Sequence, residues 1–329
     1  MSASGPLNRS TAAECPGGAH YVAGDWGTTN LRLALVEGNS GRCIKELCGP
    51  GIAYIDPPDA QAIVDRLVGE LSDEFVHDVL LCGMVGSNLG WVDTGYIDCP
   101  ARLDRLPQLL HKVVPSASAK NFGSAFIVPG LRCTNPYGSA DFMRGEELQV
   151  LGALIRGPEL CLGEHLICMP GTHCKWAWID DGELLYFCTA LSGELFALLA
   201  RHSILTGGLL QGGIDQQAFD RGVERSLANP GIDLLHLLFE TRSRQLSGEQ
   251  DASSAASFLS GLIIGRDVSA TTNLYAQGTQ QRSLVIVGDS EIAEHYQRAA
   301  SHTEFEVRVF NGNALYQAAM HHIYRLHPD

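Results

Sequence analysis

The sequence predicts an α/β protein made of two domains with similar architecture. The chain has 329 residues. This is longer than a typical domain built around one hydrophobic core and suits two domains. Hydrophobic residues make up 45% of the chain, as in globular α/β proteins. Each half opens with the same order of elements: a strand, a Gly-Thr turn, a strand, a second turn and a third strand. Identity between the halves is weak, so we interpret the repeat as duplicated architecture.

In the first half, short apolar runs separated by turn residues predict a β-meander followed by further strands. Ile63, Leu67 and Leu71 recur at helical spacing and predict a helix. The expected strands are Tyr21–Gly24, Leu31–Val36, Cys43–Leu47, Val79–Cys82 and Ala125–Val128. The expected helices are Asp59–Leu71 and Asp141–Leu154.

The second half repeats the meander and then adds helices. Ser192 is of a residue type favoured at helix N-caps, and Glu194 follows in the first turn. The expected strands are Leu166–Met169, Lys175–Ile179, Leu184–Thr189, Leu284–Val287 and Phe305–Phe310. Helical segments are expected at Ser192–Ser203, Gln216–Leu238, Ala252–Tyr275, Glu291–Ala300 and Ala314–Tyr324.

This order suggests where the domains begin and end. Residues 1–19 are rich in Ser, Ala, Gly and Pro without an apolar run, so we expect a disordered tail and no signal peptide. Residues 20–140 form the expected N-terminal domain and residues 141–329 the C-terminal domain, whose final helix is free to pack back on the first. Two like domains would each offer one Gly-Thr turn to a shared cleft, a common place for a ligand.

Charge and cysteine content exclude several functions. Lys and Arg number 23 and Asp and Glu 37, so the net charge is −14. We therefore expect no nucleic-acid partner and no anionic membrane, and no run approaches the roughly 20 apolar residues of a membrane span. The ten cysteines show neither a Cys-x-x-Cys pair nor zinc spacing. Reduced thiols in a cytoplasmic protein are expected, with a Cys43–Cys48 bridge as the disfavoured alternative and a homodimer left open.

The first Gly-Thr turn, from Asp25 to Asn30, contains groups that suit phosphate and magnesium. Gly27 permits a tight bend, while Thr28 and Thr29 place hydroxyls beside backbone N–H groups. Asp25 can hold Mg²⁺ directly or through water. On its own, this turn slightly favours an ordinary hairpin over a phosphate site.

The second turn, from Gly171 to Trp176, has the same ingredients and adds Lys175, which can neutralise a phosphate. The alternative is an exposed strand lysine. We interpret His173 and Cys174 as packing or turn residues, because no third group is apparent to orient them as a catalytic pair.

Asp141 is expected just before or at the start of a helix. There it is either an N-cap or a base that orients and deprotonates a hydroxyl. Glu146 and Glu147, one turn later, are interpreted as helix-face or metal-shell residues. The chain lacks Gly-x-x-x-x-Gly-Lys-Ser/Thr and lacks Gly-x-Gly-x-x-Gly after a strand, so any nucleotide is bound by another kind of loop.

Several motifs, in order, resemble those of the 2-dehydro-3-deoxygalactonokinase family. They are Asp25-Trp26-Gly27-Thr28-Thr29-Asn30-Leu31-Arg32, Gly83-Met84-Val85-Gly86-Ser87 with Gly90-Trp91, and Cys99-Pro100-Ala101. The similarity continues in Asp141-Phe142-Met143-Arg144-Gly145-Glu146-Glu147, Pro170-Gly171-Thr172-His173-Cys174-Lys175-Trp176 and Ser192-Gly193-Glu194-Leu195-Phe196. Departures from the family pattern are Cys174 for Ser, Phe142 for Val, and Asn88-Leu89 before Gly90.

The resemblance implies an actin-like sugar kinase with two ribonuclease H-like domains and an inter-domain cleft. It implies transfer of the ATP γ-phosphate to the 6-hydroxyl of 2-dehydro-3-deoxy-D-galactonate in galactonate catabolism, with ATP and Mg²⁺ as cofactors. Asp141 takes the place of the base by topology, and Asp25 that of the metal ligand. The implied nucleotide residues are Asp25, Gly27, Thr28, Thr29, Gly171, Thr172, Lys175, Gly288 and Asp289. Those on the sugar-acid side are Asn30, Arg32, Gly86, Ser87 and Trp91.

Alternatives stay open at three levels. Arg32 is alternatively a strand arginine facing solvent, and Trp91 a core residue. The acceptor is alternatively another 2-keto-3-deoxy sugar acid, such as the gluconate epimer. A non-catalytic sensor of nucleotide or sugar acid would have the same fold, but the presence of Asp25, Asp141 and Lys175 favours the kinase.

Overall fold

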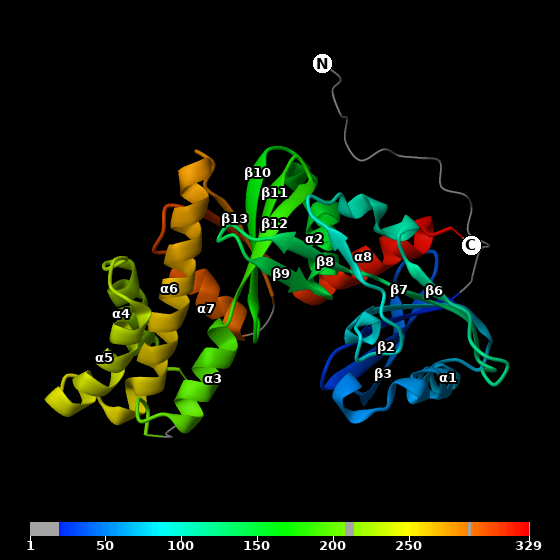
Figure 1. Ribbon diagram of the computed structural model, residues 1–329, viewed down its shortest axis with the longest axis horizontal. Helices are drawn as coiled ribbons and strands as arrows, with labels where there is room; N and C mark the ends of the chain where they lie inside the picture. Colours follow the sequence, from blue (N-terminus) through cyan, green and yellow to red (C-terminus); the bar gives the residue numbers. More distant parts are fainter. Residues whose placement is uncertain (1–19, 208–213, 289–290, 329) are drawn as a thin grey trace, which may run out of the picture. The chain divides into compact units, whose positions relative to one another are not determined.

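The computed structural model describes residues 20–207, 214–288 and 291–328 (Figure 1). The chain forms two compact units. Unit 1 contains the residues up to Leu162, together with Asp181–Tyr186 and Asn313–Asp329, and unit 2 contains Gly163–Asp180 and Phe187–Gly312. The division therefore follows Leu162 rather than residue 140, and the last helix is counted with unit 1. The expected tail, residues 1–19, lies outside the described residues.

The central sheet of unit 1 has six strands in the order β3-β2-β1-β4-β7-β6. An antiparallel meander is formed by β1 (His20–Trp26), β2 (Asn30–Glu37) and β3 (Cys43–Pro50). β4 (Val76–Gly83) and β7 (Phe122–Ile127) continue in parallel to β1, and β6 (His111–Val113) is antiparallel to β7. Because β1 and β4 are parallel and in register, Trp26 lies opposite Gly83 at the carboxyl ends of these two strands.

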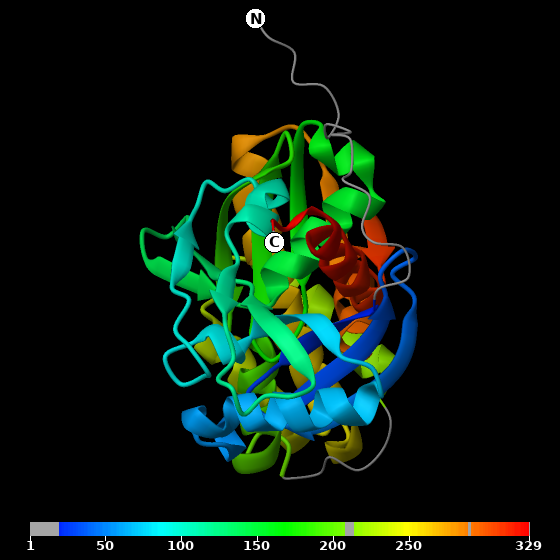
Figure 2. The same cartoon turned by 90° about the vertical axis from the view of Figure 1, so that its right-hand side faces the viewer.

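Helices cover both faces of this sheet (Figure 2). Val22 of β1 lies in a core cluster with residues of α1 (Ala60–Leu71). The preceding residue, Tyr21, points to the other face, where it stacks on Tyr324 of α8 (Gly312–Leu326) with ring centroids 4.0 Å apart. The alternation of strand side chains thus attaches one helix to each face.

A second, three-stranded sheet in unit 1 has the order β5-β8-β9. It consists of β5 (Tyr96–Asp98), β8 (Gly130–Thr134) and β9 (Ala140–Met143), and α2 (Glu146–Arg156) follows. The helix expected from Asp141 therefore begins only at Glu146, and Asp141 lies in β9. The reason is the antiparallel pairing of β9 with β8, which a search for helical periodicity does not detect.

The sheet of unit 2 has five strands in the order β12-β11-β10-β13-β14. Its strands are β10 (Glu164–Met169), β11 (Cys174–Asp180), β12 (Glu183–Ala190), β13 (Ser283–Val287) and β14 (Glu306–Phe310). β10 is antiparallel to β11 and parallel to β13, which is parallel to β14. Both large sheets therefore begin with a meander and continue with parallel strands from its first strand.

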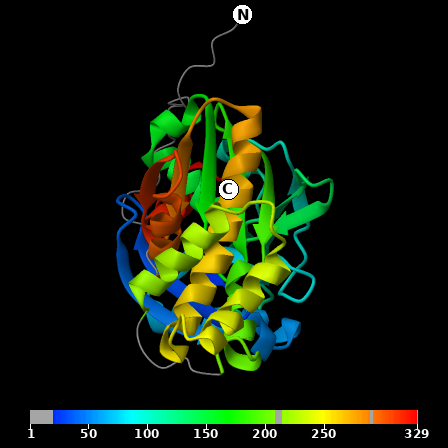
Figure 3. The same ribbon diagram turned by 90° about the vertical axis from the view of Figure 1, so that its left-hand side faces the viewer.

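The helices of unit 2 are α3 (Ser192–His202), α4 (Gln216–Leu227), α5 (Leu234–Ser247), α6 (Ala255–Gly278) and α7 (Glu291–Ala300), and α4, α5 and α6 lie together (Figure 3). The expected helical stretch over 216–238 is interrupted between α4 and α5. Pro230 and Gly231 separate the two helices. Asp233 is the N-cap of α5, and its side chain accepts a hydrogen bond from Leu235 N.

Short 3-10 turns complete the chain: η1 (Ile52–Tyr54), η2 (Pro57–Asp59), η3 (Met84–Gly86), η4 (Leu103–Gln108), η5 (Pro158–Cys161) and η6 (Ala252–Ser254). The matching strand orders of the two units confirm the predicted duplication. Within the ranges that the structure covers, no helix has the length and apolar character needed to cross a bilayer.

Candidate active site

The first Gly-Thr turn joins β1 to β2 and offers backbone N–H groups to solvent. Gly27 N donates to Asn30 O at 2.9 Å and closes the turn. The carbonyls of residues 27–29 accept bonds of 3.1, 3.0 and 3.2 Å from the N–H groups of residues 51–53. Thr28 and Thr29 are exposed, and within the described chain their own N–H groups donate to no carbonyl. A turn of this kind suits an anion.

Gly83, at the end of β4, keeps the space beside this turn open. Its φ is +84°, a backbone conformation that favours glycine. A Cβ here would lie 2.8 Å from Trp26 O and 3.1 Å from Asp25 Oδ1. Any larger residue would therefore push against the carboxylate of the turn.

Asp25 carries the charge of the first turn. Removal from water raises the pKa of Asp25; the Arg32 guanidinium opposes this rise and the Glu146 carboxylate adds to it. The Asp25 side chain is nevertheless exposed, and the thiol of Cys82 is 3.9 Å from its Oδ1. An accessible carboxylate of this kind can meet a cation or a phosphate-bound metal.

Two glutamates at the start of α2 have very different surroundings. Glu146 Oε2 accepts a hydrogen bond from Arg144 N at 3.1 Å, and the Glu146 charge contributes to the raised pKa of Asp25. Glu147 is fully buried, and its Oε2 accepts a bond from Gly145 N at 2.7 Å. Burial raises the pKa of Glu147 to about 8, with the Glu146 charge adding to the effect. Glu147 is therefore mainly protonated at neutral pH, whereas Glu146 is the carboxylate next to the first turn.

Asp141 lies within the hairpin formed by β8 and β9. Its Oδ2 accepts from Asn135 Nδ2 at 3.2 Å and its Oδ1 from Phe142 N at 2.9 Å. The charges of Arg32 and Glu146 both act on the pKa of Asp25. Glu146 is therefore a second carboxylate to consider beside Asp141.

The loop from residue 83 to residue 101 was expected to meet the sugar acid, and its side chains have several roles. Ser87 is buried, and its hydroxyl donates to Met84 O at 2.7 Å and accepts from Leu89 N at 3.3 Å. Trp91 is half-buried and packs against the core, edge-on to Phe122. The core alternative for Trp91 is therefore present in the structure.

Three other predicted sugar-acid residues lie at different places in unit 1. Arg32 is exposed on β2, paired in register with Asp25. Asn30 Nδ2 donates to Thr29 Oγ1 at 3.2 Å. A Cβ at Gly86 would lie 2.7 Å from Nη1 of Arg144, so this glycine makes room for a guanidinium.

The second Gly-Thr turn joins β10 to β11 in unit 2. Lys175 is only 6% exposed, so the alternative of an exposed strand lysine is wrong. Its Nζ donates to His173 O at 3.5 Å. Thr172 O accepts from Glu194 N at 2.9 Å, which attaches the turn to the start of α3.

The carboxylate of Asp267, in α6, accepts hydrogen bonds from several residues around this turn. Its Oδ1 accepts from Trp176 Nε1 at 2.9 Å, and its Oδ2 from Ser192 Oγ at 2.9 Å and from the Tyr296 hydroxyl. Burial raises the pKa of Asp267, and these donors counteract the rise. The expectation that Ser192 caps α3 is wrong: the N-cap is Leu191, and the Ser192 hydroxyl binds Asp267 instead.

The expected adenosine-side turn follows β13. Gly288 N donates to Phe310 O at 2.9 Å, which ties the end of β13 to β14. Asp289 lies outside the described residues. The described cysteines are free thiols, Cys43 and Cys48 included.

The residues around Asp25 fit a magnesium ion that arrives with a nucleotide. Across the described ranges, no three His, Cys, Asp or Glu side chains are grouped closely enough to hold a metal by themselves. Mg²⁺ commonly takes one or two carboxylates and completes its shell with phosphates and water. Asp25, whose side chain is exposed, would supply such a carboxylate.

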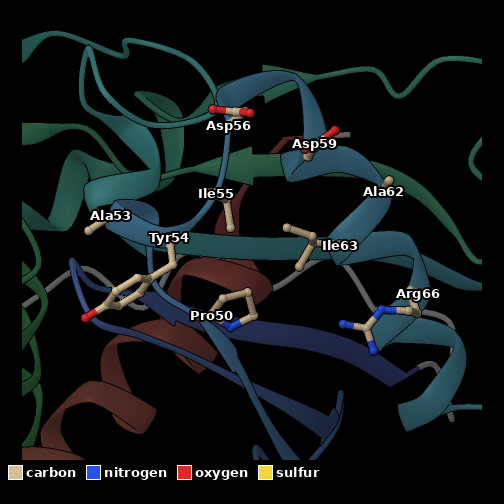
Figure 4. Close-up of a pocket in the computed structure, with 9 residues that line it drawn as sticks. All are labelled: Pro50, Ala53, Tyr54, Ile55, Asp56, Asp59, Ala62, Ile63 and Arg66. Atoms are coloured by element: carbon tan, nitrogen blue, oxygen red, sulfur yellow. The ribbon is translucent and has the colours of Figure 1, made fainter.

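A surface pocket of about 750 Å³ lies beside the segment that supports the first turn (Figure 4). Ala53, one of its lining residues, donates its N–H to Thr28 O at 3.0 Å. None of the predicted site residues lines this pocket. The lining residues are Pro50, Ala53, Tyr54, Ile55, Asp56, Asp59, Ala62, Ile63 and Arg66.

Sequence reasoning missed two side chains and underrated a third. Arg144 and Asp267 were not singled out, and Glu146 was interpreted only as a helix-face or metal-shell residue. The signal for Arg144 was available, because it lies inside the motif that carries Asp141 and Glu146. Asp267 has no comparable signal, since only the packing of four elements shows its role.

Comparison with known proteins supports the assignment that the motifs suggested. The model of the family described as 2-keto-3-deoxy-galactonokinase matches residues 25–323. A 2-dehydro-3-deoxygalactonokinase of Escherichia coli (strain K12) is 32% identical over 306 residues, which cover 93% of this chain and 97% of that protein. A protein named probable 2-dehydro-3-deoxygalactonokinase in Rhizobium meliloti (strain 1021) is 30% identical over 304 residues, 92% of this chain and 95% of that protein.

A solved structure leads to the same group of proteins. It is a crystal structure from Sinorhizobium meliloti, provisionally assigned as a 2-dehydro-3-deoxygalactonokinase, with 30% identity and a TM-score of 0.80. The match covers 91% of this chain and 96% of that chain. On this sequence and structural similarity, the chain belongs to the 2-keto-3-deoxy-galactonokinase family and is a sugar-acid kinase with the actin-like fold.

Proposed function

We propose that this kinase transfers the γ-phosphate of ATP to the 6-hydroxyl of 2-dehydro-3-deoxy-D-galactonate, a step of galactonate catabolism. The single observation that carries the proposal is the first turn, where accessible Asp25 lies beside N–H groups that donate to no carbonyl of the described residues. A second Gly-Thr turn lies at the matching place in the sheet of unit 2. The E. coli relative, 32% identical, is named for this substrate.

The nucleotide side draws on both turns. Gly27, Thr28 and Thr29 bind phosphate oxygens through backbone N–H and hydroxyl groups, and Asp25 holds Mg²⁺. In unit 2, Gly171 and Thr172 likewise bind phosphate oxygens, and Lys175 adds a positive charge. The turn after β13, with Gly288 and Asp289, contacts the adenosine. Bound magnesium supplies charge neutralisation at the phosphates.

The sugar-acid side is assigned to unit 1. Asn30 and Arg32 follow the first turn on β2, and Gly86, Ser87 and Trp91 belong to the loop from residue 83 to residue 101. The hydrogen bonds of Ser87 within its own turn favour a role in shaping this loop over direct contact. Trp91 packs against the core and so also favours a role in shaping the loop.

Phosphoryl transfer needs a base that orients the acceptor hydroxyl and takes its proton as the new P–O bond forms. Asp141 is the base that its place in the chain predicts. Glu146 is the alternative base, because the charge of the Glu146 carboxylate raises the pKa of Asp25. Both carboxylate oxygens of Asp141, in contrast, accept hydrogen bonds within the β8–β9 hairpin. Of the two, the surroundings favour Glu146. The buried Glu147 is mainly protonated at neutral pH, which makes it unsuited to the role.

ADP release over a panel of sugar acids tests the function. We expect ADP with 2-dehydro-3-deoxygalactonate and ATP, and much less with the gluconate epimer or with water alone. Faster release with the gluconate epimer would change only the name of the substrate. No release with any acid, together with binding of nucleotide or acid, would contradict the kinase and support a sensor.

A further inference from the structure

The Arg144 side chain reaches into the loop from residue 83 to residue 101 and binds only neutral groups there. Nη1 donates to Thr94 Oγ1 at 2.8 Å, and Nη2 donates to Gly95 O at 2.8 Å. The guanidinium carbon lies 4.5 Å from the centre of the Tyr96 ring. These contacts fix the plane of the guanidinium without neutralising its charge.

The guanidinium has donors to spare. It carries five N–H groups, and two of them are used by Thr94 and Gly95. Nε is buried without a hydrogen-bond partner among the described residues. In unit 1 Arg132 is paired with Asp98 and Arg102 with Asp104, whereas Arg144 forms no such ion pair with any residue that the structure describes. A partly buried cation of this kind favours the arrival of an anion.

The two glutamates that follow Arg144 closely in the chain do not fill this need. Glu147 lies in the electrostatic range of Arg144, but its Oε2 is bonded to Gly145 N. Glu146 binds the backbone N–H of Arg144 rather than its guanidinium. The Arg144 guanidinium therefore lies against the loop from residue 83 to residue 101, where Gly86 leaves room for Nη1.

We infer that Arg144 recognises the carboxylate of the sugar acid, an inference that rests on the proposed kinase function. A planar guanidinium matches a carboxylate with two parallel hydrogen bonds. Arg32, the cation expected from sequence for this task, is exposed on β2 in register with Asp25, and its charge lowers the pKa of Asp25. Arg144 is thus the residue that separates sugar acids from neutral sugars.

The test compares two acceptors in the wild type and in Arg144→Gln. One acceptor is 2-dehydro-3-deoxygalactonate, and the other is the neutral 3-deoxyketose in which CH₂OH replaces its carboxylate. Wild type should prefer the acid in kcat/KM. Arg144→Gln should reduce this preference by about 10- to 100-fold, mainly through KM for the acid, because a charge-assisted contact is lost. Its kcat/KM for the neutral ketose and its KM for ATP should change little.

Two further variants separate recognition from structure. Arg132→Gln removes an exposed arginine of the neighbouring strand β8 and should leave the acid preference unchanged. Arg144→Lys keeps the positive charge but lacks the planar, two-pronged guanidinium. It should retain more of the preference for the acid than Arg144→Gln. An equal loss on both acceptors, or an unchanged preference in folded Arg144→Gln, overturns the inference alone. If the wild type phosphorylates neither acceptor, the proposed function itself is wrong and the inference falls with it.

Discussion

At the scale of single residues, three carboxyl groups of unit 1 lie in different environments and are expected to behave differently. Asp25 is accessible, and its pKa is lowered by the charge of Arg32 and raised by that of Glu146. Glu146 begins α2, and Glu147 is fully buried beside it. Motif reasoning found Asp25 and its turn, because Gly-Thr chemistry is visible in the sequence. It placed Asp141 at the start of a helix because the short hairpin of β8 and β9 has no periodic signal.

Replacement of each candidate base decides between Asp141 and Glu146. We expect Glu146→Gln to lower kcat by about 100-fold or more, because the acceptor hydroxyl loses the group that takes its proton. Asp141→Asn, in which the side chain keeps its size, should lower kcat far less. Steady-state ADP release with saturating acid and ATP measures both. The reverse ranking would return the role to Asp141, and KM for ATP should stay within a few-fold in either variant.

The buried Glu147 predicts a pH-dependent loss of stability. Its pKa is raised from 4.5 to about 8 in the folded chain, so between these values the unfolded state binds fewer protons than the folded state. The free energy of unfolding attributable to this residue therefore falls as pH rises, by up to about 1.4 kcal/mol per pH unit, and becomes constant above pH 8. Glu147→Gln should remove this dependence.

Urea unfolding of the wild type and Glu147→Gln at pH 5, 6.5 and 8 measures the effect. The variant should gain stability relative to the wild type from the lowest pH to the highest. Glu304→Gln, at an exposed position, is the control and should show a flat difference. A flat difference for Glu147→Gln as well would mean that this carboxyl is ionised in the folded chain.

At the scale of elements, the second Gly-Thr turn depends on the helices behind it. Asp267 of α6 collects donors from β11, from the start of α3 and from α7. The start of α3 in turn binds Thr172 O through Glu194 N. The strands of this region were predicted from apolar runs and turn residues. The Asp267 network was not, because it joins residues 91 and 75 positions apart in the chain.

Two buried serines of unit 2 test this dependence as a matched pair. Ser192 Oγ binds Asp267 and Tyr296, while Ser226 Oγ donates to Leu262 O at 2.7 Å, between α4 and α6. Either change to alanine should cost about 1–3 kcal/mol of stability, since a buried partner is left unsatisfied. Only Ser192→Ala should also raise KM for ATP, by roughly three- to tenfold. Equal values of KM in the two variants would show that the network supports the fold but not the turn.

At the scale of the whole molecule, the duplicated sheet was the most predictable feature. Both halves show a meander with turn residues in the same order, and both sheets have it. The boundary was less predictable: residues 141–162 and 313–329 belong to unit 1, although they come late in the order of elements. Which sheet a helix packs on depends on three-dimensional contacts such as Tyr21 with Tyr324, which periodicity does not reveal.

Binding of ATP should stabilise the protein in a magnesium-dependent way. At a concentration of ATP about 100 times Kd, mass action predicts about 2.7 kcal/mol of added stability and a higher Tm. Removal of Mg²⁺ with EDTA should abolish most of this shift, because in the proposed site Asp25 would hold the ion together with the phosphates. Asp25→Asn should make the Tm shift insensitive to EDTA. A shift that is equally large without Mg²⁺ in the wild type would remove the metal from the proposed role of Asp25.

The chemical identity of the product tests the central proposal most directly. The protein is incubated with ATP, Mg²⁺ and 2-dehydro-3-deoxygalactonate, and the product is examined by phosphorus-detected NMR correlated to the sugar protons. We predict one phosphate ester per ADP, coupled to the two protons on carbon 6. A phosphate ester on another carbon, or ADP accompanied only by inorganic phosphate, would contradict the proposed function.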